Sequence, residues 1–154
     1  MLPSYQLERS ELSLIEQSGL ATTEKFVLRI TLCAWKILCH IADQWHTPVE
    51  QLTPEQIRDW LIADAKIRRE LGADAAFLQW NDDFPDLEFS DQRQDLFTPT
   101  TLTSHEKFLG RLLVSAPQVL VPIAERYQVS VAQLTTQQII GMVQQDRNCL
   151  QWQN

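Results

Sequence analysis

The stretch QLTPEQI at residues 51–57 decides the fold, because it recurs as QLTTQQI at residues 133–139. In each copy a threonine stands where a helix N-cap belongs, and a glutamine follows three residues later, which is the capping-box pattern. The leucine before the threonine and the isoleucine after the glutamine are placed to form a hydrophobic staple. Each stretch therefore predicts the beginning of an α-helix and not a functional site.

The similarity extends over a longer internal repeat. At an offset of 82 residues, 15 of the 41 positions in 24–64 are identical to their counterparts in 106–146. We interpret residues 22–64 and 104–146 as two copies of one helix–turn–helix unit within a single domain, 1–154. The predicted fold is mainly α: the two units pack as a pseudo-twofold helical bundle, with a short N-terminal helix and an irregular acidic, aromatic-rich insert at 80–99.

Helices are predicted from apolar residues at three- and four-residue steps. In the first copy they predict a long amphipathic helix at about 22–46, beginning at Thr22 as its N-cap, and a second helix from Pro54 to about Leu71. In the second copy the expected N-cap is Ser104.

The secondary structure at the start of each long helix is undecided, and the long helix of the second copy is expected to be interrupted. The β-branched residues near 27–31 leave a strand as an alternative at 26–33 and at the matching 108–114. Pro117 and Pro122 fall inside the second copy's long helix, so that helix must kink or split.

Composition bounds the function class. The formal charge of −7 disfavours a phosphate-backbone binder and an anionic membrane surface. The apolar stretch 26–38 contains Arg29, Thr31 and Lys36, so we do not expect a membrane span there. Three cysteines without a C-x-x-C pair and an N-terminus without a signal-peptide pattern predict a reduced, cytoplasmic protein.

The motif Glu-Lys-Phe-x-x-Arg, present in both copies, is the first candidate site. On a helix its lysine and arginine share one face, and like charges at that spacing repel unless a nearby anion compensates them. That anion is either a carboxylate of a partner or an acid of the chain itself, for example through a salt bridge from one copy's arginine to the other's glutamate. The candidate partner-binding residues are Lys25, Arg29, Lys107 and Arg111, with Phe26 and Phe108 expected as core anchors.

The acidic insert is the second candidate. The segment from Trp80 to Phe97 contains six acidic residues and one arginine, so it contributes −5 to the formal charge of −7. Aromatic residues are interleaved with the acids, which is typical of a segment that docks into a basic groove. The alternative is an ordinary long connection whose aromatics pack onto the bundle. The candidate partner-binding residues here are Phe84, Asp86 and Phe89.

Catalytic and metal sites are not predicted. His40, Asp43 and His46 recur at steps of three near Cys39, but no zinc motif supports them, and the insert lacks calcium-loop spacing. No nucleophile has a paired base. We therefore expect no cofactor and favour a non-enzymatic role, while a site built from scattered carboxylates stays open.

Two partial family resemblances provide alternative functions. The stretch IAERYQVSVAQL at residues 123–134 resembles the central helix–loop–helix of LysM modules, and this resemblance implies binding of N-acetylglucosamine polymers. The same stretch resembles a DNA-binding helix-turn-helix through Ala124, Val129 and Leu134, which implies a DNA-binding regulator.

The favoured interpretation is a protein–protein interaction module: an adaptor, assembly factor or regulator. Its partner is another protein, with nucleic acid disfavoured and no membrane, and a homo-oligomer stays open.

Overall fold

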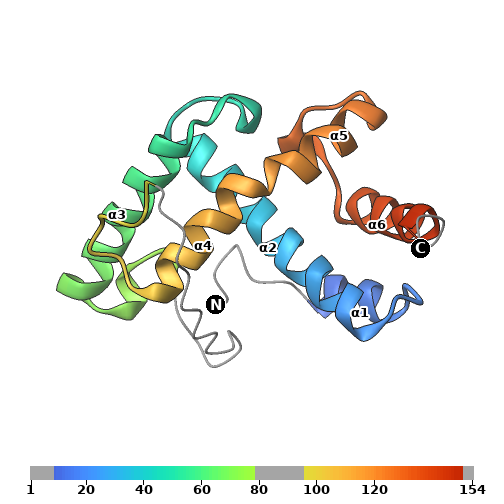
Figure 1. The fold of residues 1–154 in the computed structure, drawn as a ribbon, viewed down its shortest axis with the longest axis horizontal. Helices are drawn as coiled ribbons and strands as arrows, with labels where there is room; N and C mark the ends of the chain where they lie inside the picture. The colour runs from blue at the N-terminus through green and yellow to red at the C-terminus, as the bar shows by residue number, and fades with distance from the viewer. Residues whose placement is uncertain (1–8, 79–95, 151–154) are drawn as a thin grey trace. The chain divides into compact units, whose positions relative to one another are not determined.

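The computed structural model describes residues 9–78 and 96–150, and these residues form helices and connecting turns without a strand. Figure 1 follows the chain from α1 in blue to α6 in red. The predicted all-helical class is confirmed, and residues 26–33 and 108–114 are helix. The elements are α1 (Arg9–Glu16), α2 (Thr22–Gln44), η1 (Val49–Gln51), α3 (Pro54–Leu71), η2 (Ala73–Ala75), α4 (Ser104–Ser115), α5 (Pro117–Tyr127), η3 (Val131–Gln133) and α6 (Thr136–Leu150), with η denoting a 3-10 helix.

The chain divides into two compact units. The described part of unit 1 comprises residues 52–78 and 96–115, in which α3 packs against η2 and α4. The described part of unit 2 comprises residues 9–51 and 116–150, in which α1, α2, α5 and α6 pack together with η1 and η3. Each unit thus takes helices from both copies of the repeat.

The capping boxes predicted at α3 and α6 are confirmed. Thr53 Oγ1 accepts from Gln56 N at 3.2 Å, and Gln56 Oε1 accepts from Thr53 N at 2.9 Å. In the second copy, Thr135 and Gln138 exchange the same two bonds at 3.1 and 3.0 Å. These bonds satisfy backbone donors that the first helical turn leaves without a partner, so they fix where each helix begins.

The N-caps predicted at α2 and α4 are wrong by one residue. Ala21 precedes α2, and its backbone N–H donates to Glu24 Oε1 at 3.0 Å. Thr103 precedes α4 and forms a full capping box with Glu106, at 2.8 and 3.2 Å. The glutamate three residues on selects the cap, because its side chain reaches back only to that position.

Proline divides the second copy's long helix as predicted. Where α2 runs unbroken from Thr22 to Gln44, the corresponding residues form α4, which ends at Ser115, and α5, which begins at Pro117. A proline inside a helix removes one backbone bond and crowds the preceding turn, so a helix readily starts anew at it. Pro122 is accommodated inside α5.

The elements recur at the offset of 82 found in the sequence. α2 and α4 begin at Thr22 and Ser104, and α3 and α6 begin at Pro54 and Thr136. The short turns η1 and η3 begin at residues 49 and 131. The pseudo-twofold packing of the two copies stays a prediction.

Candidate functional site

The basic helix start of the first copy lies on α2 beside the end of α1. Lys25 Nζ lies 3.3 Å from Glu16 Oε2, and Arg29 Nη2 lies 3.2 Å from Glu16 Oε1. One carboxylate therefore bridges two cations, and all three side chains keep contact with solvent. This is the intramolecular salt bridge foreseen as the alternative, but its acid comes from α1 and not from the other copy.

Two large apolar side chains are exposed next to this cluster. Phe26 is 44% exposed and Val27 is 52% exposed, so the prediction that Phe26 anchors the core is wrong. The buried residues here are instead Leu28 and Leu32, which are four residues apart and so lie on one face of α2. The start of α2 thus presents cations and apolar surface together.

The second copy uses the same motif differently. Lys107 Nζ donates to the backbone oxygen of Thr98 at 3.3 Å, within unit 1. Lys107, Phe108 and Arg111 are half-buried, whereas Phe26 and Arg29 are exposed. The motif has therefore diverged between the copies, and only the first copy holds it on an open surface among the described residues.

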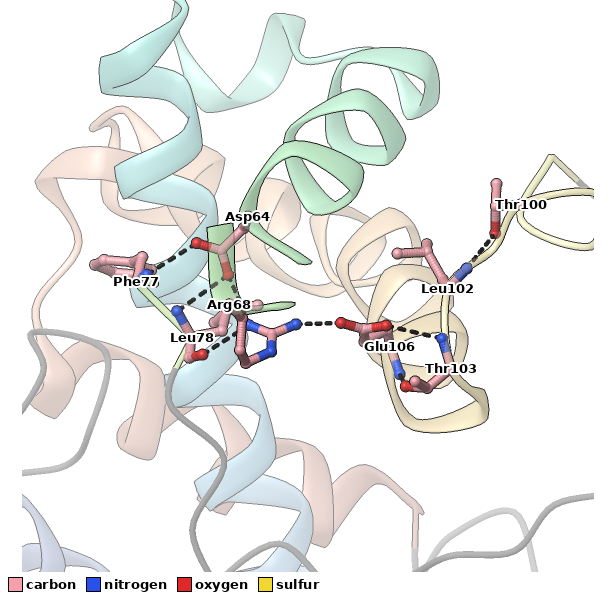
Figure 2. Close-up of polar contacts among 8 residues, drawn as sticks. All are labelled: Asp64, Arg68, Phe77, Leu78, Thr100, Leu102, Thr103 and Glu106. Atoms are coloured by element: carbon pink, nitrogen blue, oxygen red, sulfur yellow. Dashed lines mark hydrogen bonds and ion pairs between the residues drawn. The ribbon is translucent and has the colours of Figure 1, made fainter. Parts of the chain in front are cut away.

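A buried polar cluster in unit 1 joins α3, α4 and the end of the described segment at residue 78 (Figure 2). Asp64 and Glu106 are each 5% exposed, and Arg68 lies between them. Arg68 Nη1 lies 3.0 Å from Asp64 Oδ2 and donates to the Leu78 backbone oxygen at 2.8 Å, while its Nη2 pairs with Glu106 Oε2.

The two carboxylates of this cluster have further partners. Asp64 accepts from the backbone N–H of Phe77 at 2.8 Å and from that of Leu78 at 3.2 Å. No buried side-chain nitrogen or oxygen among the described residues lacks a hydrogen-bond partner. Burial of ions is tolerated only when they are paired and hydrogen-bonded in this way. We therefore assign the cluster a structural role.

The insert residues Phe84, Asp86 and Phe89 lie outside the described residues. Phe97, at the end of the aromatic block, is described and is 1% exposed. Its ring occupies the space where a side chain on Gly110 of α4 would stand. Of the two alternatives predicted for the aromatic residues of this block, packing onto the protein's own helices therefore holds for Phe97.

A shallow cleft of about 400 Å³ lies in unit 2 between α1, α2 and the start of α6. Glu11 on its wall pairs with Lys36 and accepts from Thr136 Oγ1 at 2.7 Å. These polar groups of the cleft are thus paired with one another inside the protein. Its lining residues are Ser10, Glu11, Leu14, Trp35, Lys36, Thr135, Thr136 and Gln137.

No cluster of three or more histidine, cysteine, aspartate or glutamate side chains suited to a metal is found within residues 9–78 and 96–150. Cys39, His40, Asp43 and His46 lie on or just after α2 without forming one. The absence of a cofactor stays a prediction.

Burial raises the pKa of Cys33 from 9.0 to about 11, with Lys36 lowering it and Glu11 raising it to smaller extents. Burial and then the charge of Glu50 raise the pKa of Cys39 to about 11. Because the thiolate is the reactive form, these thiols are expected to be inert at neutral pH. Neither environment is that of a catalytic nucleophile.

In a Cys149→Ser background, iodoacetamide should label Cys33 and Cys39 slowly at pH 8. A pKa of 11 in place of 9 reduces the thiolate fraction about 100-fold. The unfolded chain releases these protons above pH 9 while the folded chain holds them to about pH 11, so their contribution to stability is present below pH 9 and is lost as pH rises to 11. Denaturant titrations at pH 8 and 10 check this against Cys33→Ala/Cys39→Ala. Labelling at the rate of free cysteine would contradict the burial.

One segment of the described chain, Glu106–Tyr127, is long and apolar enough to cross a membrane by length and composition alone, with mean hydropathy 1.3 over 18 residues. Of this window 39% is buried within the protein, and the buried apolar residues of the segment are Leu109, Leu113, Ala116, Leu120, Ile123 and Ala124. A buried core helix of a soluble protein has the same composition. The expectation of no membrane partner stays a prediction.

Fold and surface together define a class: an all-helical protein in its described part, whose exposed charged and apolar side chains suit protein binding. The chain matches the family model described as NDH complex assembly factor CRR9, over residues 7–85 and 91–153, and it belongs to this family. The match covers both copies of the repeat and is interrupted only within the acidic insert.

Searches among curated proteins and among solved structures find no match. The family assigns the chain a non-enzymatic role in assembly of the NDH complex, with proteins of that complex as its interaction partners. The sequence predicted a non-enzymatic interaction module that is an adaptor, an assembly factor or a regulator, and of these the family supports the assembly factor.

Proposed function

We propose that the chain serves NDH complex assembly by binding a protein of that complex through the start of α2. We call this surface the basic face, and it consists of Lys25, Phe26, Val27 and Arg29. The observation that carries the proposal is the exposure of the aromatic side chain of Phe26 one helical turn before Arg29, with the exposed Val27 next to it in the sequence. Arginine and aromatic side chains are enriched at protein interfaces, where they act as anchors.

The charge of the basic face indicates its partner. Lys25 and Arg29 together exceed the single charge of Glu16, which leaves one positive charge on the cluster. Exposed ion pairs contribute about 0–1 kcal/mol to stability, so a carboxylate of a partner can replace Glu16 at little cost. The basic face thus fits a segment that carries carboxylates around an apolar side chain.

The remaining predicted residues form part of the same proposal. Lys107 and Arg111, at the matching helix start of the second copy, are proposed to contribute to partner binding. The acidic insert is proposed as a further docking segment, with Phe84, Asp86 and Phe89 as its contact residues. The two copies are proposed to be related by a pseudo-dyad within one domain, as the recurrence of elements at an offset of 82 supports. A cytoplasmic location and the lack of a cofactor remain part of this proposal.

The two alternative functions are not retained. The LysM resemblance calls for a strand after its second helix, whereas the described chain continues from η3 into the capped helix α6. A DNA-reading helix needs cations for the phosphate backbone, but the first turn of α6 contains threonine and glutamine. Neither alternative accounts for the family match over both copies.

Arg29→Glu is expected to reduce capture of NDH-complex proteins at least 10-fold, because it sets a carboxylate beside Glu16 and repels an acidic partner. The measurement is quantitative mass spectrometry of NDH proteins that co-purify with the tagged full-length chain. Arg9→Glu is the matched control. Arg9 is exposed at the start of α1 in the same unit, and either change moves the formal charge from −7 to −9.

A charge-swapped variant separates docking from intramolecular pairing. Glu16→Arg combined with Arg29→Glu restores the ion pair but removes the cation from position 29. This variant is expected to melt like the wild type and to bind its partner more weakly, because position 29 then presents a carboxylate although the net charge of the cluster is unchanged. Normal capture by Arg29→Glu, or equal losses with Arg9→Glu, would refute the basic face.

A further inference from the structure

The long helix of each copy ends in the same unusual way. His46 and Gln128, at the offset of 82, have φ angles of 52° and 57°, in the left-handed region that favours glycine. The hydrogen bonds also match: Thr47 N donates to Ala42 O, and Val129 N donates to Ala124 O, each at 3.0 Å. Both ends are Schellman-type caps built without glycine.

An exposed aromatic residue precedes each of these left-handed residues. Trp45 is 43% exposed and Tyr127 is 37% exposed. The caps are closed by backbone hydrogen bonds, so helix termination itself does not require an aromatic at this position. Neither ring is a core residue, and yet both copies of the repeat carry one. Exposed, rigid aromatic side chains are typical anchors of protein interfaces.

The two caps belong to the same unit and lead into turns that contact each other. Trp45 lies four residues before η1, and Tyr127 lies four residues before η3. η1 packs against η3 and α5. Glu50 Oε2 accepts from Val131 N at 3.4 Å, and Trp35 Nε1 donates to Val131 O at 2.9 Å. The two aromatic residues therefore flank one joined pair of turns.

The charges around these turns are mainly negative. Asp43 and Glu125 stand three residues before the left-handed positions, and Glu50 lies in η1; all three are exposed. Arg126 is the basic residue among them. Acids next to exposed aromatic rings suit a partner with arginine or lysine, since the rings attract cations over their faces and the carboxylates pair with them.

We infer that this surface binds a basic segment of a partner protein. We call it the acidic turn face: Asp43, Trp45, Glu50, Glu125 and Tyr127. The inference rests on the proposed assembly function but uses a different surface and the opposite charge. The basic face takes an acidic segment and the acidic turn face takes a basic one, so one copy of the chain can hold two different segments of its partners together.

The direct test uses a defined probe: a fluorescent peptide of alternating arginine and leucine, titrated into the full-length chain and followed by anisotropy. Trp45→Ala/Tyr127→Ala should weaken its binding at least about 10-fold, as two cation–π contacts are lost. A peptide with glutamate in place of arginine should not bind this face. Each ring is more than half buried, so the denaturation midpoint of the variant is measured as well, and binding is compared under conditions in which both proteins are folded.

Phe26→Ala is the matched control, because Phe26 is an exposed aromatic residue of the same unit but belongs to the basic face. Unchanged peptide affinity in Trp45→Ala/Tyr127→Ala, or an equal loss in Phe26→Ala, would overturn the inference.

The two proposals fail in different ways when NDH-complex proteins are captured. Trp45→Ala/Tyr127→Ala should lose a set of proteins that Arg29→Glu retains. If both variants lose the same set, the acidic turn face is not a separate docking surface. If Arg29→Glu captures all the proteins that the wild type captures while Trp45→Ala/Tyr127→Ala loses some, the basic face is refuted and the acidic turn face is supported.

Discussion

Arg68→Met is expected to lower the free energy of unfolding by about 3–5 kcal/mol, the cost of removing one partner from a buried ion pair. Asp64 and Glu106, each 5% exposed, would lose the guanidinium that joins them. The Leu78 backbone oxygen would lose its donor as well. Methionine preserves most of the side-chain length, so lost packing contributes little. Urea denaturation followed by circular dichroism measures the change.

Arg58→Met is the control for this prediction, since Arg58 lies on the same helix and pairs with Asp59 at 3.1 Å on the surface. Exposed pairs contribute about 0–1 kcal/mol, so the same substitution should cost far less there. Neutralising the stranded acids with Asp64→Asn and Glu106→Gln should recover part of the loss caused by Arg68→Met. Equal losses at positions 58 and 68 would show that the cluster does not stabilise unit 1.

Gly110→Ala is expected to destabilise the protein by about 2 kcal/mol, the usual cost of overpacking a core. A Cβ at this position of α4 would stand 2.5 Å from Cε1 of Phe97 and within 2.9 Å of two further ring atoms. Phe97 is 1% exposed, so its ring has no room to move away. This cost exceeds the gain of about 1 kcal/mol that alanine provides over glycine inside a helix.

Gly141→Ala provides the comparison of opposite sign. At this position of α6 the nearest atom to a new Cβ is Tyr127 Oη, at 3.8 Å, which is ordinary contact. Only the helix propensity changes, so stability should rise by up to about 1 kcal/mol. Phe97→Leu should reduce the cost of Gly110→Ala, and a double-mutant cycle measures the coupling. A stabilising Gly110→Ala would contradict the packing of Phe97.

Local signals in the sequence predicted the helix boundaries well. Thr53 with Gln56 and Thr135 with Gln138 act over three residues, and Pro117 acts on its own turn, so neighbouring residues suffice to interpret them. The same logic misplaced the N-cap of α4, because Thr103 and Ser104 are both good caps and only the reach of Glu106 decides between them.

Tertiary packing could not be predicted in the same way. The three- and four-residue pattern through Phe26 describes one helix face, but α2 buries Leu28 and Leu32 in its first half and Ile37, Leu38 and Ile41 further on. Asp64 lies four residues before Arg68 on the same helix, but the other acidic partner of Arg68, Glu106, stands 38 residues away on another helix, beyond the reach of any spacing rule. The comparison of the copies did contain a signal for the Phe97 site, since Gly110 stands where the first copy has Leu28.

The helices that make up each unit determine the order in which the two units can fold during synthesis. Unit 1 takes α3 from the first copy and α4 from the second, and these helices follow one another along the chain. Unit 2 pairs α1 and α2 with α5 and α6, which are synthesised after α3 and α4. A nascent chain that has reached residue 115 already contains α3 and α4, whereas α1 and α2 do not yet have α5 and α6 to pack against. The basic face and the acidic turn face are both in unit 2, so full binding capacity is acquired only after α5 and α6 have been synthesised.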